Sequence, residues 1–131
     1  MSNIVYTTAR ILLGLIFVIF GLNGFFPFIP VPEFHPFMEI LVSSGYIYLV
    51  KGLEIAGGLL LLSNRFIPAA LVILTPIVVN IVAYHALLDP RNWQITIVLI
   101  LLTGYLLYAH KGSFAIFFTE KGKQHTPQNP M

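Results

Sequence analysis

Four long runs of apolar residues divide the chain, and shorter segments with polar residues or proline separate them. The runs cover about residues 11–28, 46–62, 66–88 and 92–110. At about 1.5 Å per residue, an α-helix of this length can cross about 30 Å of hydrocarbon. The pattern predicts an all-α, polytopic membrane protein in which four transmembrane helices form an antiparallel bundle.

The connections between the runs carry structural signals of their own. The first connection is rich in proline, and residues 37–44 within it can form a short helix at the membrane interface. Gly45 is expected to separate this helix from the second span. Before the fourth run, a carboxylate is followed by a proline, and both favour the start of a helix. We therefore predict that Asp89 caps the fourth helix and that Pro90 is its first residue.

The pattern divides the chain into a transmembrane domain over residues 1–110 and a C-terminal segment over residues 111–131. This segment begins with apolar residues that suit the interface and continues as a polar stretch, expected to be a flexible tail. Basic residues near the helix ends fall mainly on the side of the two termini, with Arg91 on the other side. They are Arg10, Arg65, Lys111, Lys121 and Lys123. The positive-inside rule then predicts that both termini are cytoplasmic.

Composition supports the membrane assignment and excludes several functions. The chain is 57% hydrophobic and 9% charged, and its mean hydropathy is +0.87. A core of 131 residues cannot hide that much apolar surface from water, so the lipid bilayer is an expected partner. The absence of cysteine excludes disulfides, thiolate metal sites and dithiol redox relays within the chain. The sequence contains no basic patch interleaved with aromatic residues, so it does not indicate a nucleic-acid partner.

Four polar residues within the apolar runs are candidates for an intramembrane site. Lys51 and Glu54 are three residues apart on one helix, so their side chains can touch. By the helical rise, Glu54 lies near the middle of the second span. Asn23 of the first span and Asn80 of the third lie about one turn further toward the outer side. Three helices thus supply polar groups at similar depth.

Two interpretations of this polar set are open. In the structural interpretation, Lys51 pairs with Glu54 and the two asparagines bridge helices, which fixes the register of the bundle without chemistry. In the functional interpretation, Glu54 is a proton or cation relay, or a hydrogen-bond anchor for a quinone or another polar headgroup.

Small residues predict where two helices approach closely. Glycines recur along one side of the first helix, and a pair of glycines follows Glu54 in the second. Small residues let helix backbones come together in a membrane, so we predict close packing of the first two helices. The glycines concerned are Gly14, Gly21, Gly24, Gly57 and Gly58.

Tyr84 and His85 extend the polar set toward the outer surface. There, His85 can in principle meet other groups that bind metals. These are Glu33, His35, Glu39 and Asp89. Their spacing is unspecific, so we interpret them as interface residues and a helix cap, and we predict no metal site.

Several short motifs coincide along the chain. They are Arg10-Ile-Leu-Leu-Gly14 followed by Phe17 and Gly21, Glu54-Ile-Ala-Gly57-Gly58-Leu-Leu, Arg65 with Ala69-Ala70, and His85 near the end of the third run. With these motifs the chain resembles the DoxX family of small four-helix bacterial membrane proteins, over approximately residues 10–110. Many relatives have a lysine after the glycine near the end of the first helix. Here Asn23-Gly24 occupies that region, and Lys51 is the candidate to take the place of that lysine as the charge partner of Glu54.

The resemblance implies a protein of the bacterial inner (plasma) membrane, with Glu54 as the counterpart of the family's characteristic glutamate. The family takes its name from a subunit linked to terminal quinol oxidation and thiosulfate:quinone oxidoreduction, but most members have no assigned reaction. We therefore expect an accessory subunit of a membrane complex, with a membrane-bound or peripheral redox protein as its partner. The chain itself is expected to hold no cofactor, and a quinone is the candidate ligand.

Two alternatives belong to other functional classes. One is a quinone-linked oxidoreductase subunit in which Glu54 relays protons. The other is a small proton-coupled transporter acting as a homo-oligomer, because four helices alone enclose little room for alternating access. Thiol exchange, found in related four-helix proteins, is excluded by the lack of cysteine.

Overall fold

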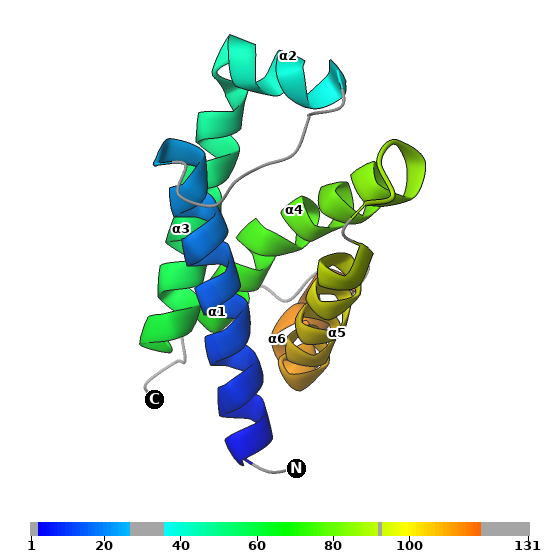
Figure 1. Ribbon diagram of the computed structural model, residues 1–131. Helices are drawn as coiled ribbons and strands as arrows, with labels where there is room; N and C mark the ends of the chain where they lie inside the picture. The colour runs from blue at the N-terminus through cyan, green and yellow to red at the C-terminus, as the bar shows by residue number, and fades with distance from the viewer. Residues whose placement is uncertain (1–2, 27–35, 92, 119–131) are drawn as a thin grey trace, which may run out of the picture.

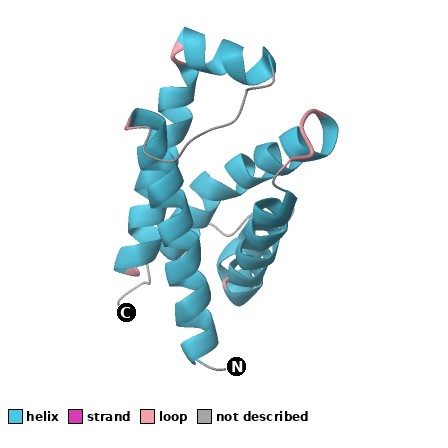
Figure 2. Cartoon of the chain, in the orientation of Figure 1, coloured by secondary structure: helices cyan, strands magenta, loops and turns pink. Residues whose placement is uncertain are grey.

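The computed structural model describes residues 3–26, 36–91 and 93–118, which form helices joined by short connections (Figures 1 and 2). No strand occurs among these residues, so the predicted all-α class is confirmed for them. The elements are α1 (Asn3–Phe25), α2 (Pro36–Ser44), α3 (Tyr46–Ser63), α4 (Ile67–Leu87), α5 (Trp93–Ala109), α6 (Lys111–Phe114) and the 3-10 helix η1 (Ala115–Phe118).

The four long helices, α1, α3, α4 and α5, follow the four predicted runs. α1 begins earlier than predicted, at Asn3, because residues 3–10 contain no glycine or proline to interrupt a helix. The predicted short helix is confirmed as α2. Gly45 separates it from α3 with a left-handed φ of 82°, a conformation that glycine adopts without a steric penalty.

Three of the long helices are long and apolar enough to cross a membrane, namely α1, α3 and α4. α5 has 17 residues and passes the same test only when it is joined to α6 and η1, from which it is bent by 76°. The described residues therefore supply three candidate spans, or four if the bent pair counts as one. The fourth span stays a prediction.

The long helices contact one another in a ring (Figure 1). α1 packs along α3, α3 contacts α4, α4 contacts α5, and α5 returns to α1. α2 lies across the end where α1 finishes, and α6 lies toward the end where α1 begins. We call these the α2 end and the amino-terminal end.

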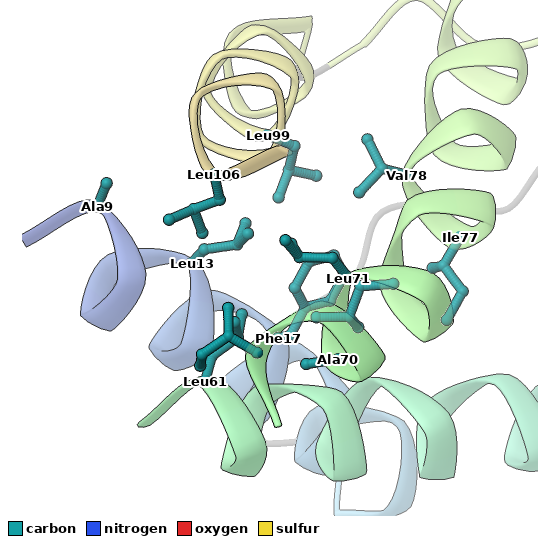
Figure 3. Close-up of a cluster of buried hydrophobic side chains, with 12 residues drawn as sticks. Ala9, Leu13, Phe17, Leu61, Ala70, Leu71, Ile77, Val78, Leu99 and Leu106 are labelled. Carbon is teal, nitrogen blue, oxygen red and sulfur yellow. The ribbon is translucent and has the colours of Figure 1, made fainter. Parts of the chain in front are cut away.

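A cluster of buried aliphatic side chains and one phenylalanine, Phe17, fills the interior (Figure 3). All four long helices contribute to it, because each carries buried residues at intervals of three or four positions. Examples are Leu13 of α1, Leu61 of α3, Leu71 of α4 and Leu106 of α5, each fully buried. The remaining faces of the helices are apolar and exposed, as expected for a surface covered by lipid.

The predicted cap of the fourth helix is wrong. α5 begins at Trp93, so Pro90 is not its first residue. The Asp89 carboxylate instead accepts hydrogen bonds from the backbone N–H of Arg91 and from its guanidinium, at 2.7–3.1 Å. The bonds from the Arg91 side chain hold the pKa of Asp89 well below its usual range. Arg91 therefore competes for the carboxylate that was expected to cap the helix.

Candidate functional site

Lys51 and Glu54 form an ion pair on α3. The Lys51 Nζ lies 3.2 Å from the Glu54 Oε2, which is the i,i+3 contact that their spacing predicts. Glu54 is only 3% exposed, whereas 23% of the Lys51 side chain is accessible. The carboxylate is therefore enclosed by protein, and Lys51 is the more accessible residue of the pair.

The position of Glu54 on α3 follows from the helical repeat. Gly57 and Gly58 lie three and four residues after it, on the same face one turn away. A Cβ atom at Gly57 would lie 2.6 Å from the side chain of Leu74 on α4, and one at Gly58 would lie 2.8 Å from the carbonyl oxygen of Gly14 on α1. This face of α3 is thus turned toward both neighbouring helices.

The end of α1 covers the outer part of the pair. A Cβ atom at Gly21 would collide with Ile55, and one at Gly24 would collide with the aliphatic part of Lys51. Both glycines thus leave room for α3, and Gly24 leaves room for the lysine stem in particular. The predicted close packing of the first two helices is confirmed at these positions.

This arrangement limits the chemistry of the pair. A buried charge that loses its partner costs about 3–5 kcal/mol, so Lys51 and Glu54 depend on each other. The Glu54 Oε2 receives no well-aligned hydrogen bond from the described residues, although the ammonium is close. It retains the capacity to accept a hydrogen bond or a proton.

The two asparagines of the predicted polar layer differ in position. Asn23 is partly buried in the last turns of α1, between the two glycines that pack against α3. Asn80 is exposed on α4, and its Nδ2 donates a 2.9 Å hydrogen bond to the carbonyl oxygen of Pro76 on its own helix. Asn80 therefore faces the surface of the chain, whereas it was predicted to lie in the polar layer beside Glu54.

Tyr84 and His85 lie at the α2 end in a separate group. The Tyr84 hydroxyl donates to the Asp89 carboxylate at 3.4 Å, and the Tyr84 ring is 6.1 Å from that of Phe37 on α2. The His85 Nδ1 is 2.9 Å from the carbonyl oxygen of Ile81 in the preceding turn. These contacts connect α2, α4 and the loop after α4.

At the amino-terminal end, two contacts join helices that are distant in sequence. Arg10 is 8% exposed, and its guanidinium donates to the carbonyl oxygens of Leu61 and Leu62 at the end of α3. The Tyr6 hydroxyl and the His110 Nε2 form a hydrogen bond of 2.6 Å between α1 and the end of α5. Neither of these contacts was predicted from the sequence.

The described residues contain no group of three or more histidine, aspartate and glutamate side chains that could hold a metal. Glu33 and His35, which the sequence suggested as possible ligands, lie outside the described residues. Glu39 lies on α2 and is exposed.

A scan against protein-family models, a search of curated proteins and a search of solved structures each found no match to this chain. The resemblance to the DoxX family therefore stays a prediction.

Proposed function

We propose that this chain is a DoxX-like integral membrane protein of the bacterial inner membrane, with four transmembrane helices and both termini in the cytoplasm. It acts as an accessory subunit of a membrane complex whose partner is a redox protein. The Lys51–Glu54 pair is its polar intramembrane site, and this site anchors a polar headgroup from a quinone or a lipid.

The burial of Glu54 carries this proposal. A carboxylate in hydrocarbon is costly, and such residues usually mark a site or a partner contact. Here the carboxylate is buried on a face of α3 that packs against α1 and α4, while the lysine beside it is partly accessible. A headgroup with carbonyl or phosphate oxygens suits such an ammonium, because those oxygens accept charge-assisted hydrogen bonds.

The same difference in exposure favours one second candidate, a proton relay. In such a relay the Lys51 ammonium would first pass a proton to the Glu54 carboxylate, 3.2 Å away, and the neutral amine that results would then take up the next proton. In this case the chain is a subunit of a quinone-linked oxidoreductase, and the partner carries the redox centre.

A comparison of glutamine variants separates these functions. Glu54→Gln keeps the shape of the side chain and removes its charge, and Glu39→Gln is a matched control at an exposed position on α2. Each tagged protein is purified from native membranes in mild detergent. Retained partners are then identified, and quinol oxidation and helicity are measured.

If the chain is an accessory subunit, we expect most of the partner to be lost when Glu54→Gln is purified, while the helical content of the variant stays normal. An intact complex that has lost quinol oxidation would favour the relay. Recovery of the wild-type chain alone, as an oligomer with substrate-dependent proton flux, would favour the transporter. If Glu54→Gln behaves like Glu39→Gln in every measurement, the pair has no functional role and the proposal is wrong.

A further inference from the structure

Asn80 of α4 uses only part of its hydrogen-bonding capacity. The residue is exposed, and its Nδ2 donates to the carbonyl oxygen of Pro76, one turn earlier on the same helix. Its Oδ1 accepts no hydrogen bond from the described part of the chain. A carboxamide has two N–H donors and an acceptor oxygen, so one N–H and the oxygen are available to a group outside the chain.

The position of Asn80 along α4 makes this unused capacity unfavourable. Asn80 lies about 20 Å along the helix from Ile67 and about 10 Å from Leu87. If the helix ends mark the membrane interface, the amide lies within the hydrocarbon, where neither water nor an acyl chain can pair with it. An unpaired polar group costs free energy there, so a second protein surface that offers both a donor and an acceptor would be stabilised at Asn80.

The residues around Asn80 form an exposed face of α4. They follow one another at intervals of three or four positions and therefore line one side of the helix, opposite the residues that α4 buries in the core. Ala83, one turn from Asn80, is small enough to let another helix approach closely. We call this surface the Asn80 face, and its exposed members are Val72, Pro76, Asn80, Ala83 and Leu87.

We propose that two copies of this chain pair through the Asn80 face, with the Asn80 side chains bonded to each other. Copies that insert with the same topology are related by a two-fold axis along the membrane normal, so each residue of the face lies at the same depth as its counterpart. The free N–H of each Asn80 then meets the free Oδ1 of the other, because a carboxamide both donates and accepts.

This self-complementarity is the reason to choose a second copy as the occupant. A different membrane protein would need a matching polar group at the same depth, whereas a second copy carries one by symmetry. Asn80 then bridges helices, as the sequence suggested, but it does so between chains. The pairing uses neither Lys51 nor Glu54 and does not depend on the function proposed for them.

The lack of native cysteine allows a direct test by cross-linking. Ala83→Cys puts one thiol on the Asn80 face, about 6 Å along α4 from Leu87. Ile97→Cys is the matched control, because Ile97 is exposed on α5 about 6 Å from Trp93, at the same end of the molecule. Both proteins are oxidised in native membranes with copper phenanthroline. Ala83→Cys is expected to give a product of twice the chain mass, and Ile97→Cys should stay monomeric.

Substitution of Asn80 tests the hydrogen bonds themselves. Asn80→Leu keeps a branched side chain of similar size without the amide, so the pairing should weaken about ten-fold. Asn80→Gln keeps the amide and should pair within about three-fold of the wild-type chain. Pairing is measured by energy transfer between copies labelled at Ser113→Cys, an exposed position on α6, as the protein is diluted with lipid. The Ala83→Cys cross-link decides the question even if Asn80→Leu fails to fold.

The proposal is overturned if Ala83→Cys gives no product of twice the chain mass. It is also overturned if Ile97→Cys gives as much of that product, since random collision would then explain both. Pairing of Asn80→Leu as tight as that of the wild-type chain would show that the amide has no part in it. A cross-link from Ala83→Cys to a protein of different mass would assign the Asn80 face to another subunit.

Discussion

Arg10 shows how one charged residue can be accommodated in the interior of this chain. The last carbonyl groups of a helix have no partner within it, and at the end of α3 the guanidinium of Arg10 supplies donors to two of them. The negative end of the helix dipole favours a cation at the same place. Burial of Arg10 is thus explained by its contact with α3.

Substitution of Arg10 tests this contact. Arg10→Met keeps an apolar stem of similar length and removes the donors, so we expect the free energy of unfolding to fall by about 2 kcal/mol, as for hydrogen bonds to charged groups. Arg65→Met is the control, because Arg65 is exposed at the same end of the chain. Unfolding is followed in mixed detergent micelles by circular dichroism. Equal stabilities of the two variants would contradict the assigned contact.

The pairing of α1 with α3 depends on residues that have no side chain. Four glycines let the two helices approach so closely that a Cβ atom would have no room at these positions. They are Gly14, Gly21 and Gly24 on α1 and Gly58 on α3. This packing positions Glu54 as well, because Gly58 is on its face one turn further along α3. The site and the helix interface therefore form one structural unit.

Alanine substitutions on α3 measure how tight this interface is. A Cβ at Gly58 would be 2.8 Å from a backbone oxygen of α1, which cannot move without shifting the helix. We expect Gly58→Ala to destabilise the chain by about 1–3 kcal/mol, as overpacking usually does. Gly52→Ala meets open space and should be neutral or stabilising by up to about 1 kcal/mol, because alanine favours helix more than glycine does.

Both free energies of unfolding are measured in the same detergent system as those of the arginine variants. A Gly58→Ala chain as stable as Gly52→Ala would mean that α1 and α3 are further apart than described.

In the whole molecule, short elements flank the long helices at both ends. α2 lies across the end where α1 finishes. At the other end, α6 and η1 are bent away from α5 by 76°, and Phe117 and Phe118 are exposed. The Tyr6–His110 hydrogen bond joins α1 to the point where α5 ends, and so helps to close the ring of helices. If α5 is a fourth span, α2 and α6 lie on opposite sides of the membrane.

The lack of native cysteine makes the topology directly testable. We expect Glu39→Cys on α2 to react in intact cells with a maleimide that cannot cross the membrane. Ser113→Cys on α6 should react only after the cells are made permeable. Both positions are exposed in the structure. Labelling of both from outside would indicate three spans, and the reverse pattern would contradict the predicted cytoplasmic termini.

The sequence predicted the elements better than it predicted their contacts. Helical periodicity describes well what depends on neighbours within about four residues. This applies to the ranges of α2, α3, α4 and α5 and to the contact of Lys51 with Glu54. Asn80 was expected beside Glu54 because depth along a helix can be counted. Its direction around the helix axis could not be counted, and it is exposed.

By itself, the sequence determined the all-α class, the apolar helices and the place of a carboxylate near the middle of the second run, because chain length, hydrocarbon thickness and helical repeat are local constraints. Only the tertiary structure decided that Arg10 caps α3, that Tyr6 meets His110 and that Asn80 is exposed. Those contacts depend on how helices are rotated and tilted against one another, and that is set by the packing of many side chains at once.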